Sequence, residues 1–134
     1  MAQAGNRYVI KLTPSQLGWG EERYTDSRPR RKGEAYLAIP RDIAKKYNLY
    51  NSNKTNGLDI LGVNIFKCTS SDGFLSCEFK SQGDKKRGDE YAKQFSGNDN
   101  LKLLGNWYKH VNAQVGDEVE VYFLTPYEIQ LTLL

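Results

Sequence analysis

The chain has 134 residues and a mass of 15.3 kDa, which is the size of one domain. Its 39% hydrophobic and 12% aromatic residues exclude a disordered chain, and no apolar run approaches the roughly 20 residues of a membrane span. The net charge is +3, and the first residues contain no apolar signal core, so we expect a cytoplasmic protein.

The first part of the chain predicts two strands and one short helix. Residues 7–13 alternate apolar and polar side chains, as a half-buried strand does. Residues 14–34 are rich in glycine, proline and basic residues and poor in aliphatic ones, so they predict an irregular charged excursion. A second strand over 35–39 ends at Pro40, and apolar residues four positions apart then predict a helix over 42–47.

A β-hairpin is predicted around Asp72-Gly73, because both positions tolerate the positive φ of a two-residue type I′ turn. Counting outward from this turn places apolar residues opposite each other on one face and opposite charges on the other face. The pairs that this register predicts are Phe66 with Phe79, Cys68 with Cys77, and Lys67 with Glu78.

The register brings the two cysteines of the chain together. A disulfide between them is one alternative, but a cytosolic setting favours two buried thiols. Two cysteines and His110 do not fill the four positions of a zinc site, so we expect no metal. The place of His110 after several bulky residues indicates a surface or helix-end histidine rather than a general base. We therefore expect neither the cysteines nor the histidine to be functional.

The second part of the chain begins with another charged excursion, over residues 81–100, that contains Lys85-Lys86-Arg87 and few large apolar residues. A helix is predicted over 101–110, and two closing strands are predicted over 119–124 and 128–133. In total the chain predicts a mainly β fold of six or seven short strands and two short helices, arranged as a small barrel or a curved sheet.

The positive charge is clustered in two segments. Residues 23–46 contain eight basic and three acidic residues, and residues 80–93 contain five basic and three acidic ones. Segment 23–31 uses arginine alone as its basic residue, and the arginine fork suits phosphates and guanine edges. If both segments lie on one side, they form a cationic cleft for nucleic acid; the alternative is that they are solvated loops. Trp19, between two glycines, is either an exposed stacking residue or an anchor for its loop.

No phosphate-binding loop, metalloprotease motif or serine nucleophile motif is present in the sequence. One catalytic alternative is a small Mg²⁺-dependent nuclease that uses Asp59, Glu78 and Lys80, since these residues follow the Asp…Glu-x-Lys pattern of restriction nucleases. However, an acidic residue followed two positions later by lysine is expected about once by chance in such a composition. The hairpin register also gives Glu78 a structural partner in Lys67, which weakens this alternative.

Several motifs together resemble one family. Trp19-Gly20, a run of arginines and Gly33-Glu34-Ala35-Tyr36-Leu37-Ala38-Ile39-Pro40 are similar to the start of the B3-like DNA-recognition domain of bacterial restriction endonucleases. This domain is related to plant B3 transcription-factor domains. The later positions that agree are Asp72-Gly73, Gln82, the lysine-rich segment, Asn100, Leu104-Gly105 and Val115-Gly116-Asp117.

The resemblance implies a seven-stranded open pseudobarrel with two short helices. It also implies that two arms, one between the first two strands and one between the fourth and fifth, grip duplex DNA in the major groove. In this chain the arms correspond to residues 14–34 and 81–97, and the first arm is lengthened around 21–27. In the family a separate catalytic domain cuts the DNA.

The resemblance therefore predicts a sequence-specific effector domain for double-stranded DNA in the bacterial cytoplasm, without a cofactor, a metal or a catalytic residue of its own. A nuclease domain or subunit is the further partner that it implies. A single-strand or RNA-binding barrel is a third alternative. The expected DNA-binding residues are Trp19, Arg23, Arg28, Arg30, Arg31, Lys32, Lys45, Lys46, Ser81, Gln82, Lys85, Lys86, Arg87, Asp89 and Lys109.

Overall fold

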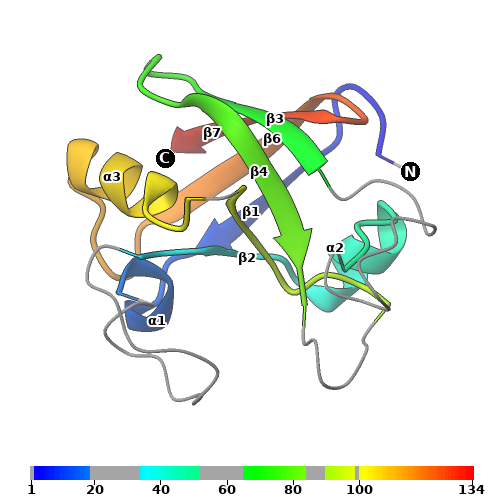
Figure 1. Ribbon diagram of the computed structural model, residues 1–134, viewed down its shortest axis with the longest axis horizontal. Coiled ribbons are helices and arrows are strands. Elements are labelled where there is room, and N and C mark those ends of the chain that lie inside the picture. Colours follow the sequence, from blue (N-terminus) through cyan, green and yellow to red (C-terminus); the bar gives the residue numbers. More distant parts are fainter. Residues whose placement is uncertain (1, 19–33, 52–64, 84–89, 99) are drawn as a thin grey trace.

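A computed structural model describes residues 2–18, 34–51, 65–83, 90–98 and 100–134 (Figure 1). Within these ranges the structure has seven strands and three short helices. In chain order they are β1 (Arg7–Lys11), α1 (Pro14–Leu17), β2 (Leu37–Ala38), α2 (Arg41–Lys46), β3 (Ile65–Ser70), β4 (Ser76–Gln82), β5 (Gln94–Gly97), α3 (Leu103–His110), β6 (Glu118–Thr125) and β7 (Glu128–Leu133).

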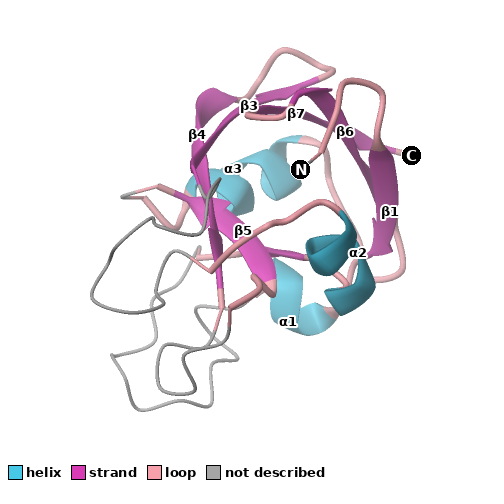
Figure 2. Ribbon diagram, turned by 90° about the vertical axis from the view of Figure 1, so that its right-hand side faces the viewer, coloured by secondary structure: helices cyan, strands magenta, loops and turns pink. Residues whose placement is uncertain are grey.

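All seven strands form one sheet in the order β1-β6-β7-β3-β4-β5-β2. Neighbouring strands are antiparallel, except that β3 and β7 run parallel. Figure 2 shows the sheet curving strongly around its own inner face. The two edge strands, β1 and β2, approach each other (Figure 1), and the hydroxyl of Tyr8 in β1 reaches the carbonyl of Ala38 in β2. The predicted pseudobarrel is therefore confirmed, as a nearly closed barrel-like sheet.

Aromatic side chains fill the inside of the barrel. Alternate residues of each strand point inward, and the buried ring of Phe66 makes edge-to-face contacts with Phe95 and Phe123 at centroid distances of 5.2 and 6.5 Å. Trp107 of α3 and Tyr47, which follows α2, are buried as well. The two helices therefore contribute to the same core as the strands.

Helix α1 bridges the two edges of the sheet. The amide of Gln16, which is 2% exposed, donates to the carbonyl of Lys11 in β1 at 3.1 Å and accepts from the N–H of Ala38 in β2 at 2.9 Å. The hydroxyl of Tyr8 in β1 also donates to the carbonyl of Ala38, at 3.1 Å. We call this set of contacts, made by Tyr8 and Gln16 to the opposite strand edges, the seam.

The structure confirms the predicted register of the hairpin between β3 and β4, but the predicted type of its turn is wrong. Phe66 pairs with Phe79, Cys68 with Cys77, and Lys67 with Glu78. However, the N–H of Gly73 donates to the carbonyl of Ser70, so Ser71 and Asp72 are the central residues of the turn. Gly73 then follows with a φ of +81°, while Asp72 is not in the positive-φ region. The loop between the two strands therefore has four residues instead of the predicted two, but the residues of β3 and β4 pair as predicted.

Both cysteines are free thiols in this ladder, with Cys68 buried and Cys77 half-buried. Burial raises the pKa of the Cys68 thiol well above its ordinary value, so this group stays protonated at neutral pH. Its environment is that of a small apolar core residue rather than a reactive cysteine.

Each of the two charged excursions contains an element that the sequence did not predict. The first contains α1, whose start is fixed by Thr13, because the hydroxyl of this residue accepts from the N–H of Gln16. The second is bounded by the end of β4 at Gln82 and by β5, a strand that the sequence did not predict. The two expected helices are present as α2 and α3, so the described part of the chain has three helices where two were predicted. No helix in the described ranges is long and apolar enough to cross a membrane.

Candidate nucleic-acid interface

The connection between β4 and β5 is held to the barrel at both of its ends. At the first end, the N–H of Gly83 donates to Oδ1 of Asn51 at 2.8 Å. At the other end, the N–H of Lys93 donates to the carbonyl of Gln82 at 2.7 Å, and the carbonyl of Lys93 accepts from the N–H of Ile39 at 2.8 Å. Residues 90–93 therefore lie between β4 and the chain that leads into α2.

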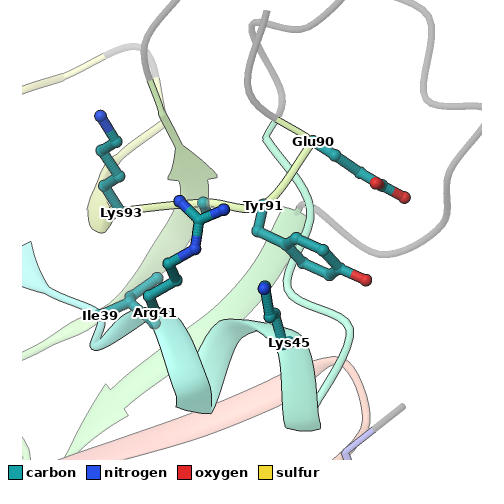
Figure 3. Close-up of a pocket in the computed structure, with 7 residues that line it drawn as sticks. Ile39, Arg41, Lys45, Glu90, Tyr91 and Lys93 are labelled. Carbon is teal, nitrogen blue, oxygen red and sulfur yellow. The ribbon is translucent and has the colours of Figure 1, made fainter.

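A pocket of about 310 Å³ lies where this segment meets α2 (Figure 3). Arg41 and Lys45 line it from α2, and Tyr91 and Lys93 line it from the segment before β5. The remaining lining residues are Ile39, Glu90 and Ala92. In Figure 3 the guanidinium of Arg41 lies between Lys93 and Tyr91, whereas the carboxylate of Glu90 points away from Arg41 and Lys93. The pocket is therefore lined by three cations, with its acidic residue turned outward.

The sequence of α2 explains why two of these cations share one face. The helix begins after Pro40, has Asp42 in its first turn and carries Lys45 and Lys46 in its last turn, which is the charge order that a helix dipole favours. Arg41 and Lys45 are four residues apart, so their side chains project from the same side of the helix. The buried side chain of Ala44 and the core residue Tyr47 hold the opposite side against the barrel.

Of the predicted DNA-binding residues that the structure describes, the lysines are exposed on two helices and Ser81 is buried. Lys45 and Lys46 are exposed on α2, and Lys46 has its ammonium 5.6 Å from the ring centroid of Tyr47. Lys109 is exposed on α3, which lies at the other end of the molecule from α2 in Figure 1. Ser81 is buried, and its hydroxyl donates to the carbonyl of Tyr50 at 2.7 Å, so this hydroxyl is used inside the root of the connection.

Gln82 is half-buried, and its Oε1 accepts from the hydroxyl of Ser96 on β5. This bond orients the amide at the point where β4 ends. The remaining predicted residues lie outside the described ranges; they are Trp19, Arg23, Arg28, Arg30, Arg31, Lys32, Lys85, Lys86, Arg87 and Asp89.

Two cations of the pocket, Arg41 and Lys93, were missed as site residues by the sequence reasoning. The spacing of Arg41 and Lys45 was a signal that could have joined them on one helix face. Lys93 offered no comparable signal, because its place beside Arg41 depends on the backbone bond between residues 39 and 93.

The residues of the nuclease alternative do not form a described cluster. Glu78 and Lys80 lie two positions apart on β4, and Lys67 stands opposite Glu78 in the ladder as predicted. The amide of Asn98 donates to Oε1 of Glu78 at 3.4 Å. Asp59 lies outside the described ranges. Among the described residues, no three histidine, cysteine or carboxylate side chains are grouped as metal ligands.

Comparison with known proteins gave one informative match. The family model described as the NgoFVII C-terminal B3-like DNA-binding domain matches residues 7–122, which span β1 to most of β6. Neither the curated proteins nor the solved structures gave a match. The match therefore covers six of the seven strands of the barrel, together with the pocket at α2.

Proposed function

The chain belongs to the family of the NgoFVII C-terminal B3-like DNA-binding domain, and on this basis we propose that it binds duplex DNA sequence-specifically as the target-recognition part of a restriction enzyme. Cutting is assigned to a separate nuclease domain or subunit, so this chain has no catalytic role. The observation that carries the proposal is the family match over nearly the whole barrel. The cationic pocket supports it, since DNA binding depends strongly on cations that neutralise phosphates.

Two connections are proposed to enter one major groove, the first between β1 and β2 and the second between β4 and β5. In the first connection the base-reading side chains are arginines, and in the second they are Gln82 and the charged residues that follow it. Arginine and lysine recognise guanine O6 and N7, glutamine recognises adenine, and a carboxylate accepts from cytosine N4. Lys45, Lys46 and Lys109 contact phosphates and fix the register without reading sequence.

Alanine variants of the two connections test this division of roles. A cognate duplex is first selected from a random pool, and each variant is titrated against it and against a scrambled duplex at two salt concentrations. Loss of a base-reading arginine should cost about 1–3 kcal/mol on the cognate duplex and little on the scrambled one. Equal losses on both duplexes for all the variants would reduce the connections to an electrostatic patch and contradict sequence reading.

Binding assays with different nucleic acids, and cleavage assays with metal ions, distinguish the proposed duplex binding from the nuclease and single-strand alternatives. The chain should shift duplex DNA in preference to single-stranded DNA or RNA, and it should leave plasmid DNA intact with Mg²⁺ or Mn²⁺. Cleavage that is lost in a Glu78→Ala variant would establish the nuclease alternative instead. Preferred binding of single strands would favour a barrel that stacks bases on exposed aromatic side chains.

A further inference from the structure

The pocket at α2 has a chemistry that differs from that of a base-reading surface. Arg41, Lys45 and Lys93 line one volume of about 310 Å³ from two separate segments of the chain. A base edge is planar and is read by a single arginine fork or amide, whereas a phosphate offers oxygens in several directions. Three cations that approach from a helix and from an extended segment therefore fit a tetrahedral anion better than a base edge.

The backbone around the pocket is fixed by hydrogen bonds on every side. The N–H of Ala92 donates to the carbonyl of Leu49 at 2.8 Å, and the N–H of Asn51 donates to the carbonyl of Glu90 at 2.9 Å. With the bonds of Lys93 to Gln82 and Ile39, the segment 90–93 is held to three other parts of the chain. The backbone positions from which the side chains of residues 90–93 project are consequently fixed before any ligand arrives, so no ordering of this backbone opposes binding.

An aromatic pair closes one side of the pocket. The ring of Tyr91 stacks on Tyr50 with a centroid distance of 5.5 Å and an interplanar angle of 23°. The same two residues form an isolated β-bridge. In Figure 3 the ring of Tyr91 stands over α2, above Lys45. The ring of Tyr91 therefore forms one wall of the pocket, and its stacking on Tyr50 supports the position of that wall.

We propose that this pocket binds one backbone phosphate of the duplex at the root of the β4–β5 connection, with Arg41 and Lys93 as its central contacts. The inference rests on the proposed function. Because Arg41 belongs to α2 and Lys93 to the connection, a phosphate bound between them fixes the position of the connection relative to the DNA backbone. The contact is independent of sequence, and it sets the register in which the neighbouring residues reach the bases.

Substitutions that remove charge and keep length test the pocket. Arg41→Gln and Lys93→Gln are made singly and together, and Lys67→Gln is the matched control, because Lys67 is exposed on β3 between the acidic residues Glu78 and Glu128 of its neighbouring strands. Circular dichroism checks that each variant is folded. The double variant should lose affinity equally for cognate and scrambled duplexes, and its slope of log K against log salt should fall by about one unit. The Lys67→Gln control should keep the wild-type affinity and the wild-type slope of log K against log salt.

A neutral methylphosphonate, placed at one position at a time in the cognate duplex, then locates the phosphate. The wild-type chain should bind several of these duplexes more weakly, one for each contacted phosphate, and the double variant should fail to distinguish one of them from the unmodified duplex while it still distinguishes the others. Inorganic phosphate, followed through the backbone amide NMR signals of residues 41 and 93, tests the pocket as a site for a free anion.

The outcomes separate the two proposals. A chain that binds no duplex at all overturns the proposed function and the pocket with it. A chain that binds duplex while the double variant behaves like the Lys67→Gln control overturns the pocket alone. Binding of inorganic phosphate without any effect of the variants on DNA identifies a free-anion site and also overturns the backbone contact.

Discussion

Asp72 shows how one side chain fixes two elements at once. Its Oδ1 accepts from the N–H of Phe74 at 2.8 Å and from the hydroxyl of Ser70, while its Oδ2 accepts from Nε1 of Trp107 at 2.9 Å. The carboxylate thus orients the β3–β4 turn and satisfies the buried indole of α3. Phe74 also stacks on His110 at a centroid distance of 4.1 Å, which places this histidine on the surface at the end of its helix, as predicted.

Acid should weaken the fold through Asp72. The hydrogen bond from Ser70 is the largest influence that lowers the pKa of Asp72, and the bonds from Phe74 and Trp107 act in the same direction. Because the pKa is lower in the folded chain than in the unfolded one, the stabilisation is complete above the ordinary aspartate pKa of about 3.9 and is lost as the pH falls through the folded value. We expect an Asp72→Asn variant to lose less stability than the wild type between pH 5 and pH 2.

Urea denaturation at a series of pH values measures this difference, with the free energy of unfolding compared between the two proteins. The asparagine side chain of the variant keeps the shape of the turn but carries no charge to titrate. If the variant lost stability with acid as steeply as the wild type, other carboxylates would be responsible and Asp72 would have no special role.

At the scale of elements, local patterns predicted more than long-range contacts did. Alternation and charge pairing predicted the register of β3 and β4, and helical spacing predicted α2 and α3, since these signals lie within a few residues. By contrast, β5 was not predicted, because its four residues form a strand only by pairing with β4 and β2. The second strand was predicted over 35–39, but only Leu37 and Ala38 belong to β2, so tertiary pairing decided its length.

In the candidate site, too, local sequence signals predicted some residues, whereas the positions of others depend on long-range contacts. Lys45 and Lys46 could be predicted because a basic cluster near a helix is visible in the sequence. The burial of Ser81 and the place of Lys93 could not be predicted, because they depend on which backbone groups of distant residues lie beside them in the fold. The period of a strand shows that successive side chains alternate, but the partner of a buried hydroxyl is set by the fold.

Gly97 is required for the passage from β5 toward α3. A Cβ atom at this position would lie 2.0 Å from the backbone carbonyl oxygen of Asn100 and 2.8 Å from Cδ1 of Leu103. The backbone has to move to admit a methyl group, so Gly97→Ala should lower the free energy of unfolding by about 1–3 kcal/mol.

Gly18→Ala is the matched control for this prediction. A Cβ atom at Gly18 would find its nearest neighbour at 3.5 Å, and the φ of −129° is open to any residue. Its effect on the free energy of unfolding should stay within about 0.5 kcal/mol. Thermal or urea denaturation compares the two variants, and equal losses would show that the close approach at Gly97 relaxes without cost.

At the scale of the whole molecule, the exposed cations are distributed over both ends. Helices α2 and α3 lie at opposite ends of the long axis in Figure 1, and both carry their lysines in the last helical turn. The strands of the barrel lie between these two helices in Figure 1. A duplex that contacts both Lys45 and Lys109 would therefore run along the length of the domain.

This arrangement makes an additive prediction. Lys45→Ala and Lys109→Ala should each weaken binding of any duplex, and the double variant should show the sum of the two free-energy losses within about 0.5 kcal/mol, because distant sites with no shared partner act independently. Fluorescence anisotropy with one duplex at fixed salt measures all three variants. A loss confined to Lys45→Ala would place α3 away from the DNA.

The seam at α1 also has a consequence for how the protein behaves at high concentration. A strand edge with open N–H and C=O groups is a template on which a second chain can pair. Here Gln16 and Tyr8 bind the N–H and the carbonyl of Ala38, and Gln16 also binds the carbonyl of Lys11, so the edge groups that face the seam are already used. Replacing Gln16 by alanine would uncover the N–H of Ala38 and the carbonyl of Lys11, and edge-to-edge association into dimers or aggregates would then compete with the closed barrel. Helix α1 thus protects the edges of β1 and β2 from pairing with a second chain, because Gln16 already binds backbone groups that a neighbouring strand would bind.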